Sequence, residues 1–211
     1  MLKGAATWAM TSIRSICVYC GSSTGNDPRY VEAARSLGYS IAEAGLRLVY
    51  GGGTRGIMGA VSDATLAGGG KVTGIIPRFL LNREAADRGL QRLTDLIVTD
   101  NMHQRKHALF EHSDAFVAMP GGIGTLEEII EIMTWAQLGH HTKPIVLANI
   151  NRFWDPLTGL LTHMREAGFI HTANLVRPIV VNSAEAIVPA ILAASIKSPV
   201  EDGDVDVIDK L

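Results

Sequence analysis

Short runs of apolar, mostly β-branched residues alternate along this chain with longer segments of helical pattern. The short runs predict strands at Ile13–Cys20, Leu46–Tyr50, Lys71–Ile76, Leu93–Thr99, Ala115–Met119, Pro144–Asn149 and Ile179–Val181. The longer segments predict helices near Arg29–Ala44, Gly56–Ala67, Met102–His112, Leu126–Leu138, Pro156–Ala167 and Ala184–Ala194. Continuous apolar runs are typical of parallel strands buried on both faces. We therefore predict a Rossmann-like, doubly wound α/β fold: a mainly parallel sheet of about seven strands with helices on both faces.

The length and the pattern together indicate one domain. The chain has 211 residues, close to the roughly 100–200 residues expected per domain. We assign a single Rossmann-like domain to residues 13–197. Residues 1–12 contain no secretory cleavage site and are expected to form a loose extension. Residues 198–211 are expected to be an acidic, disordered tail, because Glu201–Leu211 carries five acidic side chains and one lysine.

The charge balance argues against polyanionic partners. The formal net charge is −2 and the sequence pI is about 6.4, so no basic field gathers nucleic acid or anionic lipid. No apolar run approaches the roughly 18 residues of a membrane span. We therefore expect a cytoplasmic protein with no nucleic-acid or membrane partner, in which a local site holds any anionic ligand.

Two residue pairs have the spacing of metal ligands, and we interpret neither as a metal site. Cys17 and Cys20 lie three apart on a predicted strand, so their side chains point to opposite faces, and no second C-x-x-C motif is present. We expect two buried, reduced thiols. His103 and His107 lie four apart on a predicted helix, but the glutamate of H-E-x-x-H is missing. The sequence therefore predicts no metal.

Three glycine-rich or small-residue turns directly follow predicted strands. They are Gly21–Gly25, Gly51–Gly56 and Pro120–Thr125. One such turn is weak evidence, because tight connections need glycine anyway. In parallel sheets, however, ligands bind beyond the carboxyl ends of the strands. Three turns at one edge of the sheet therefore predict a shared ligand site.

The strongest of these signals is Pro120–Glu128, which connects a buried strand to a helix. Its glycines let the backbone approach a ligand, and the free N–H groups of a helix start attract an anion such as phosphate. Thr125 is expected to cap the helix or to add a hydroxyl donor. The segment is neither a P-loop nor a dinucleotide fingerprint. Glu127 and Glu128 are open to two interpretations: function, or simple complementarity to the helix dipole.

A basic pair, Arg105 and Lys106, opens a helix near the same edge of the sheet. Two cations there can bind a phosphate and a ribose or carboxylate. The alternative is a solvated basic turn. The helix Leu126–Leu138 is apolar on most sides, which indicates either ordinary core or a surface covered by a second copy. We expect a homodimer.

At these residues the sequence resembles the LOG family, the cytokinin riboside 5′-monophosphate phosphoribohydrolases. The family pattern P-G-G-x-G-T-x-x-E is matched at Pro120–Glu128, and the R-K pair of M-H-x-R-K is Arg105 and Lys106. The C-G-S-S turn, the G-G-G-x-x-G-x-M-G segment at Gly51–Gly59 and the segment Thr134–Gly139 are also similar to the family. The resemblance runs from about Ile16 to about Pro199.

The resemblance implies a Rossmann-like dimer that hydrolyses nucleoside 5′-monophosphates, either cytokinin riboside monophosphates or AMP, to free base and ribose 5-phosphate. It implies that Arg105 and Glu128 are catalytic. It also implies a set of substrate contacts: Gly21, Ser22, Glu84, Met102, Lys106, Gly121, Gly122, Ile123, Gly124, Thr125, Glu127 and Thr134. No cofactor is expected.

Two other functions were weighed. Members of the family have been labelled lysine decarboxylases, but a pyridoxal phosphate enzyme needs a Schiff-base lysine and an acidic partner for the pyridinium nitrogen. No lysine here has that context. A non-catalytic nucleotide or molybdenum-cofactor carrier could use the same glycine loops. The arginine paired with the motif glutamate favours hydrolysis.

Overall fold

The structure, a computed structural model, describes residues 13–81, 87–170 and 176–197. The extension and the tail expected at residues 1–12 and 198–211 lie outside the described residues. Seven parallel strands form one sheet in the order β4-β3-β2-β1-β5-β6-β7. They are β1 (Ser15–Tyr19), β2 (Arg47–Tyr50), β3 (Lys71–Pro77), β4 (Asp95–Thr99), β5 (Ala115–Ala118), β6 (Ile145–Ala148) and β7 (Ile179–Val181). The predicted fold class is confirmed.

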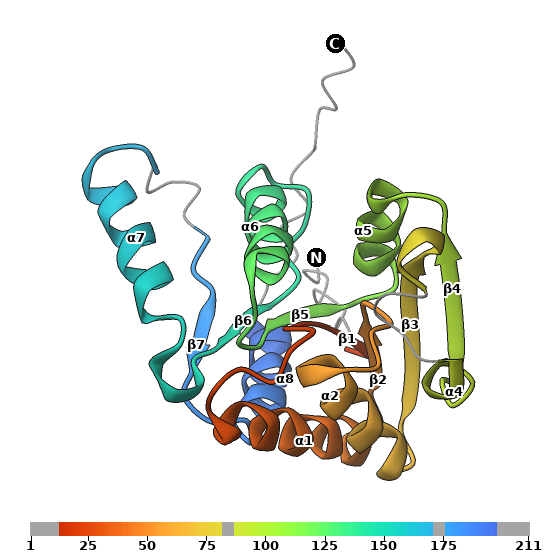
Figure 1. Cartoon of the computed structure of the whole chain (residues 1–211). Helices are drawn as coiled ribbons and strands as arrows, with labels where there is room; N and C mark the ends of the chain where they lie inside the picture. Colours follow the sequence, from red (N-terminus) through yellow and green to blue (C-terminus); the bar gives the residue numbers. More distant parts are fainter. Residues whose placement is uncertain (1–12, 82–86, 171–175, 198–211) are drawn as a thin grey trace, which may run out of the picture.

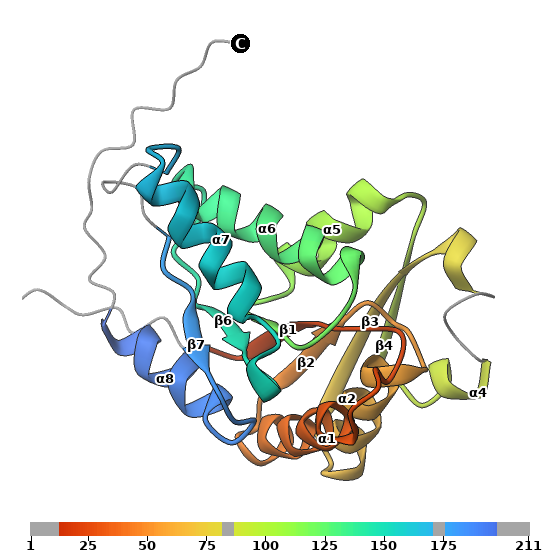
Figure 2. The ribbon, with the colours of Figure 1, turned by 60° about the vertical axis from the view of Figure 1, so that its left-hand side comes forward.

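Helices cover both faces of the sheet (Figures 1 and 2). One face carries α1 (Pro28–Glu43), α2 (Gly56–Ala67) and α8 (Ile187–Lys197). The other carries α5 (Met102–Glu111), α6 (Ile123–Gln137) and α7 (Asp155–Glu166). Within the described residues, three short helices occur that the pattern did not predict: η1 (Arg78–Leu80), α4 (Asp87–Leu90) and η2 (Ile150–Arg152). No helix of the described residues is long and apolar enough to cross a membrane.

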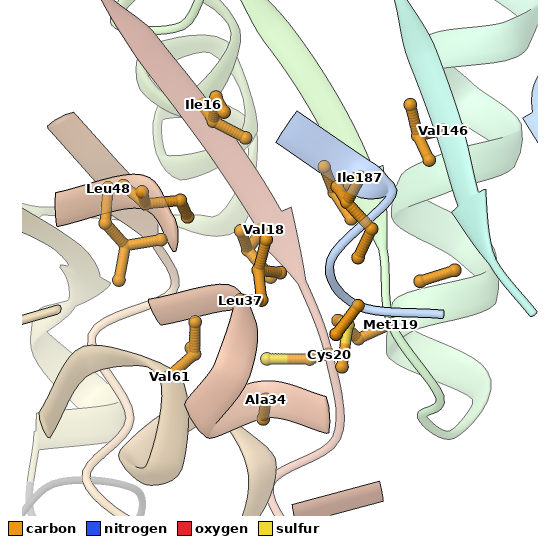
Figure 3. Close-up of a cluster of buried hydrophobic side chains, with 14 of the residues drawn as sticks. Ile16, Val18, Cys20, Ala34, Leu37, Leu48, Val61, Met119, Val146 and Ile187 are labelled. Atoms are coloured by element: carbon orange, nitrogen blue, oxygen red, sulfur yellow. The ribbon is translucent and has the colours of Figure 1, made fainter. Parts of the chain in front are cut away.

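The central strand β1 divides the core in two. Ile16, Val18 and Cys20 pack toward α1, α2 and α8 (Figure 3), whereas Cys17 and Tyr19 pack toward α5, α6 and α7. The alternation follows from the two-residue period of a strand. Both thiols are free and buried, on opposite faces as predicted. Burial raises the pKa of each thiol well above its ordinary value.

The strand order fixes where a ligand binds. From β1 the chain adds β2, β3 and β4 on one side and then returns to place β5 on the other side of β1. Cys17 accordingly pairs with Val49 of β2 and with Phe116 of β5. The winding direction reverses between β1 and β5, which opens a crevice at their carboxyl ends.

The two helices α1 and α2 pack closely because Gly38 has no side chain. A Cβ atom at Gly38 would lie 2.5 Å from the Val61 carbonyl oxygen and 2.7 Å from the Ala64 Cβ atom. The contact is with backbone, which a rotamer change cannot relieve. In contrast, a Cβ atom at the exposed helical Gly159 of α7 would meet nothing within 4 Å.

These two glycines predict opposite effects of the same substitution. Gly38→Ala is expected to lower the free energy of unfolding by about 1–3 kcal/mol, because overpacking outweighs the gain in helix propensity. Gly159→Ala is expected to raise it by roughly 0.5–1 kcal/mol. Urea unfolding of both variants measures the difference. A Gly38→Ala protein at least as stable as the wild type would contradict the close packing.

Candidate active site

A cavity of about 300 Å³ lies at the carboxyl ends of β1 and β5. All three glycine-rich turns predicted to converge contribute to its wall. The cavity is lined by Val18, Tyr19, Cys20, Gly21, Ser22, Gly51, Met58, Arg105, Gly122, Ile123, Gly124, Thr125 and Glu128. The structure therefore brings the predicted pair Arg105 and Glu128 to one place with the glycine loop.

The start of α6 forms one wall of this cavity. The helix begins at Ile123, three residues before the predicted Leu126, and its N-cap is Gly122. No side chain caps it, so the expectation that Thr125 caps the helix is wrong: Thr125 lies inside the first turn and is buried. Side chains at Gly122 or Gly124 would meet nothing within 4 Å. The backbone N–H groups of this turn are thus open to an anionic ligand.

Gly121 is needed for packing rather than for ligand approach. A side chain at Gly121 would collide with the Thr125 hydroxyl and would lie 2.8 Å from the Gly21 nitrogen. The Gly21 N–H group donates to the Pro120 carbonyl oxygen at 3.1 Å. The turns after β1 and β5 are therefore held against each other.

The start of α2 is used differently from the start of α6. The N–H groups of Ile57 and Met58 both donate to the Gly21 carbonyl oxygen, at 3.1 and 3.2 Å. Gly56 has a φ of +60°, and a side chain there would collide with the Ser22 backbone. The N–H groups at the start of α2 therefore bind the protein's own backbone rather than a ligand. This contact fixes the β1 turn, while the start of α6 faces the cavity.

Arg105 is positioned by the first turn of α5. Asn101 caps this helix by accepting from the Gln104 N–H group at 3.0 Å. The guanidinium, which is buried, donates from Nε to the Ile75 carbonyl oxygen at 3.3 Å and from Nη2 to the Gly51 carbonyl oxygen at 3.4 Å. A side chain at Gly51 would collide with Nη2. The carboxyl ends of β2 and β3 therefore hold the cation in place.

Glu128 lies opposite this guanidinium. Arg105 Nη1 is 3.7 Å from Glu128 Oε1, and the two side chains are only 9% and 12% exposed. This distance is too long for a hydrogen bond, but the charges are mutually stabilising in a poorly solvated site. The pair leaves a carboxylate and a cation facing the same small cavity.

Several predicted contacts lie outside this cavity. Lys106 Nζ donates to Glu127 Oε1 at 2.8 Å and to Glu131 Oε1 at 2.9 Å, and these two carboxylates raise the pKa of Lys106. Thr134 donates to the Ile130 carbonyl oxygen at 2.8 Å and borders a second cavity between α6 and α7. None of these side chains lines the cavity that holds Arg105 and Glu128.

Met102 and Glu84 are two further side chains that the resemblance predicts to contact the substrate. The Met102 sulfur lies 3.9 Å from Arg105 Nη1, so it contacts the arginine rather than the cavity. Glu84 lies outside the described residues. No group of three or more potential metal-binding side chains occurs within the residues that the structure describes.

Sequence reasoning missed four residues that line the cavity: Val18, Tyr19, Cys20 and Met58. Tyr19 had a usable signal: it ends β1 on the same face as Cys17, directly before a predicted ligand-binding turn. Met58 had a weaker one, since it lies only two residues inside α2.

Comparison with known proteins identifies the family. Residues 58–191 match the family model described as "Possible lysine decarboxylase". A cytokinin riboside 5′-monophosphate phosphoribohydrolase from Rhodococcoides fascians is 44% identical over 179 residues, which cover 84% of this chain and 89% of that protein. The phosphoribohydrolase LOG of Oryza sativa subsp. japonica is 43% identical over 173 residues, covering 82% and 69%. The chain belongs to the LOG family.

Solved structures show that this LOG-family chain shares its fold with carriers. The molybdenum cofactor binding protein from Rippkaea orientalis superimposes with a TM-score of 0.63 at 23% identity, over 87% of this chain and 98% of that one. The molybdenum cofactor carrier protein from Chlamydomonas reinhardtii gives 0.62 at 21% identity, over 88% and 100%. Identity this low establishes the common fold and nothing about the ligand.

Proposed function

We propose that this protein hydrolyses the N-glycosidic bond of purine nucleoside 5′-monophosphates, AMP or its N6-prenylated cytokinin forms, to free base and ribose 5-phosphate. The observation that carries the proposal is the pair of the buried Arg105 and the half-buried Glu128 beside the start of α6, which no side chain caps. The names of the relatives, which are cytokinin riboside 5′-monophosphate phosphoribohydrolases, support it.

The α6 start supplies the phosphate site. Its N–H groups and the helix dipole attract a dianion, and the absence of side chains at Gly122 and Gly124 lets the phosphate reach the backbone. The comparable N–H groups of α2 are occupied by the Gly21 carbonyl oxygen. The N–H groups at the start of α6 can therefore bind the single phosphate group of a nucleoside monophosphate.

Glu128 supplies the chemistry one turn further along α6. When the C1′–N9 bond breaks, its electron pair leaves with the base and positive charge develops on the ribose. The Glu128 carboxylate stabilises that charge and accepts a proton from the water that adds to C1′. The departing base takes a proton from solvent. Arg105 holds the carboxylate and the sugar in the relative orientation that the reaction needs.

The lysines of the site do not support a decarboxylase. A Schiff-base lysine must lose its proton, and burial or a neighbouring cation lowers its pKa for that purpose. Lys106 has the opposite environment, because two carboxylates raise its pKa. Among the lysines whose side chains are described, none lines the cavity. The residues that line the cavity fit glycoside hydrolysis better than decarboxylation.

We also propose that the enzyme is a homodimer, in which the α6–α7 surface is covered by a second copy. An apolar cavity of about 250 Å³ separates these helices and contains Ile130, Met133 and Leu161. Three apolar side chains that line it, Leu160, Met164 and Phe169, are exposed. Leu126 and Leu138, at the two ends of α6, are exposed as well. An exposed apolar patch of this kind is typical of a protein–protein interface.

We propose that the protein is cytoplasmic. Cys17 and Cys20 are free, buried thiols, and reduced cysteines are typical of cytoplasmic proteins.

The dimer predicts a particle of twice the chain mass of 22.6 kDa in light scattering. Leu160→Lys is expected to shift the protein toward the monomer, because it places a charge in the interface. Leu192→Lys, on the exposed side of α8 on the opposite face of the sheet, is the matched control and should leave the mass unchanged. A wild-type monomer at working concentration would contradict the proposal.

The catalytic role of Glu128 predicts a change in rate without a matching change in binding. Glu128→Gln should keep the fold and bind AMP, yet lose roughly 10²–10⁴-fold in kcat, because an amide neither accepts a proton nor stabilises the cationic ribose. Glu166→Gln, at the exposed end of α7, is the control and should retain full turnover. Measuring kcat, AMP affinity and thermal midpoint separates the roles. Unchanged kcat with a lowered midpoint would mean that Glu128 only complements the helix dipole.

A further inference from the structure

Lys106, which the family resemblance assigns to the substrate, bridges two carboxylates of α6 instead. Its Nζ group donates to Glu127 Oε1 at 2.8 Å and to Glu131 Oε1 at 2.9 Å. Its side chain does not line the cavity that holds Arg105 and Glu128. The contacts of this lysine are therefore with the neighbouring helix, and we call them the Lys106 bridge.

The Lys106 bridge connects α5 and α6 directly beside the proposed catalytic pair. Arg105 and Lys106 are consecutive residues of α5, and Glu127 and Glu128 are consecutive residues of α6. The Arg105–Glu128 and Lys106–Glu127 ion pairs therefore connect the same two helices at neighbouring positions. The two helices lie side by side on one face of the sheet (Figure 2). A change at one connection is thus felt at the other.

Two anchor points fix α6 more closely than one would. Glu127 and Glu131 are four residues apart, so they lie on one face of the helix, about 6 Å apart along its axis. Lys106 Nζ is within hydrogen-bond distance of both carboxylates. A slide of α6 along its axis, or a rotation about it, would lengthen at least one of these bonds. The bridge therefore opposes the movements that would carry Glu128 away from Arg105.

Other contacts of α6 are less directional or lie further from the site. Ile129 and Ile132 pack in the apolar core, and apolar burial stabilises a helix without fixing its direction. Phe110 of α5 and Trp135 of α6 meet edge to face, with 5.1 Å between their centroids, close to the far ends of both helices. Lys106 supplies a directional link at the end where the cavity lies.

Arg105 is unable to follow a movement of α6. Its Nε and Nη2 groups donate to the carbonyl oxygens of Ile75 and Gly51, so the guanidinium stays with the sheet. Glu128, in contrast, moves with α6. The distance of 3.7 Å between Arg105 Nη1 and Glu128 Oε1 therefore depends on how α6 is held. Small displacements of reacting groups are costly in rate, because the reaction needs close alignment.

The Lys106 bridge is shielded from water and keeps its charge. The side chains of Lys106 and Glu131 are only 16% and 24% exposed, so water competes less for this pair than for an ion pair on the surface. Hydrogen bonds to Glu127 and Glu131 raise the pKa of Lys106. The amine is therefore a cation, and the bridge is present, at neutral pH.

We propose that Lys106 is a positioning residue for the reaction: it bridges Glu127 and Glu131 and so holds α6 with Glu128 opposite Arg105. The proposal rests on the proposed hydrolysis and replaces the substrate contact that the family resemblance implies for Lys106. Since the lysine acts through α6 and not through the substrate, its effect is on the rate of the chemical step.

A double-mutant cycle separates a bridge from a substrate contact. Lys106→Met and Glu131→Met each break the bridge and keep a long, unbranched side chain. Each is expected to lower kcat about 10–100-fold. The double variant is expected to lower kcat no further, because both changes remove the same interaction. It also keeps the net charge of the wild type, so its AMP affinity should stay at the wild-type value.

Two further variants serve as controls. Lys106→Arg keeps a cation that can bridge two carboxylates and should retain most of the wild-type kcat. Arg92→Met removes the cation of an exposed ion pair of similar length, 2.9 Å to Asp63 of α2, and should change neither kcat nor AMP affinity. Thermal unfolding of each variant verifies that it is folded. Wild-type kcat in either single variant, or a loss in the double variant equal to the product of the two single losses, would overturn the proposal.

Amide hydrogen exchange gives a readout that does not depend on turnover. Loss of the Lys106 bridge should speed exchange along α6 in Lys106→Met and in Glu131→Met alike, and should leave α8, on the opposite face of the sheet, unchanged. Equal exchange in the wild type and both variants would overturn the proposal. If the wild type releases no base from AMP while exchange still changes, the proposed function fails and the Lys106 bridge stands.

Discussion

The site depends on how a buried arginine is held opposite a half-buried glutamate. Isolated charges in such a place are costly, and each must be compensated. Arg105 is compensated by carbonyl oxygens of Ile75 and Gly51 as well as by Glu128. These contacts explain why Gly51 has no side chain, because one would collide with the guanidinium. The guanidinium in turn lies 3.7 Å from the carboxylate that we propose as the catalytic group.

The topology assembles this arrangement from distant parts of the chain. The carboxyl ends of β1, β2, β3 and β5 lie at one edge of the sheet, so turns separated by up to a hundred residues meet there. Two helix starts point to the same region, but only that of α6 faces the cavity. A fold shared with molybdenum-cofactor proteins thus carries at this edge the side chains to which we assign hydrolysis.

The sequence predicted the parallel sheet, because apolar runs and glycine turns report burial and strand ends directly. The pairing of Arg105 with Glu128 was implied by the resemblance to the LOG family. The sequence pattern placed the start of α6 at Leu126 rather than Ile123, since Ile123 and Gly124 read as loop residues. It also grouped Lys106 with the site, where the structure pairs it with Glu127 and Glu131. Such pairings depend on how α5 and α6 face each other, which periodicity along one helix does not encode. Tyr19 is a different case, because its place at the end of β1, directly before a predicted ligand-binding turn, was a usable signal.

We propose that the start of α6 binds the 5′-phosphate of a nucleotide whose glycosidic bond Glu128 cleaves. The most direct test compares AMP with adenosine as substrates of the purified protein, with free adenine as the measured product. The account predicts release of adenine and ribose 5-phosphate from AMP, with kcat/KM at least a hundredfold above that for adenosine, about 2.7 kcal/mol of phosphate binding energy used in the transition state. Comparable kcat/KM values for the two substrates would contradict it.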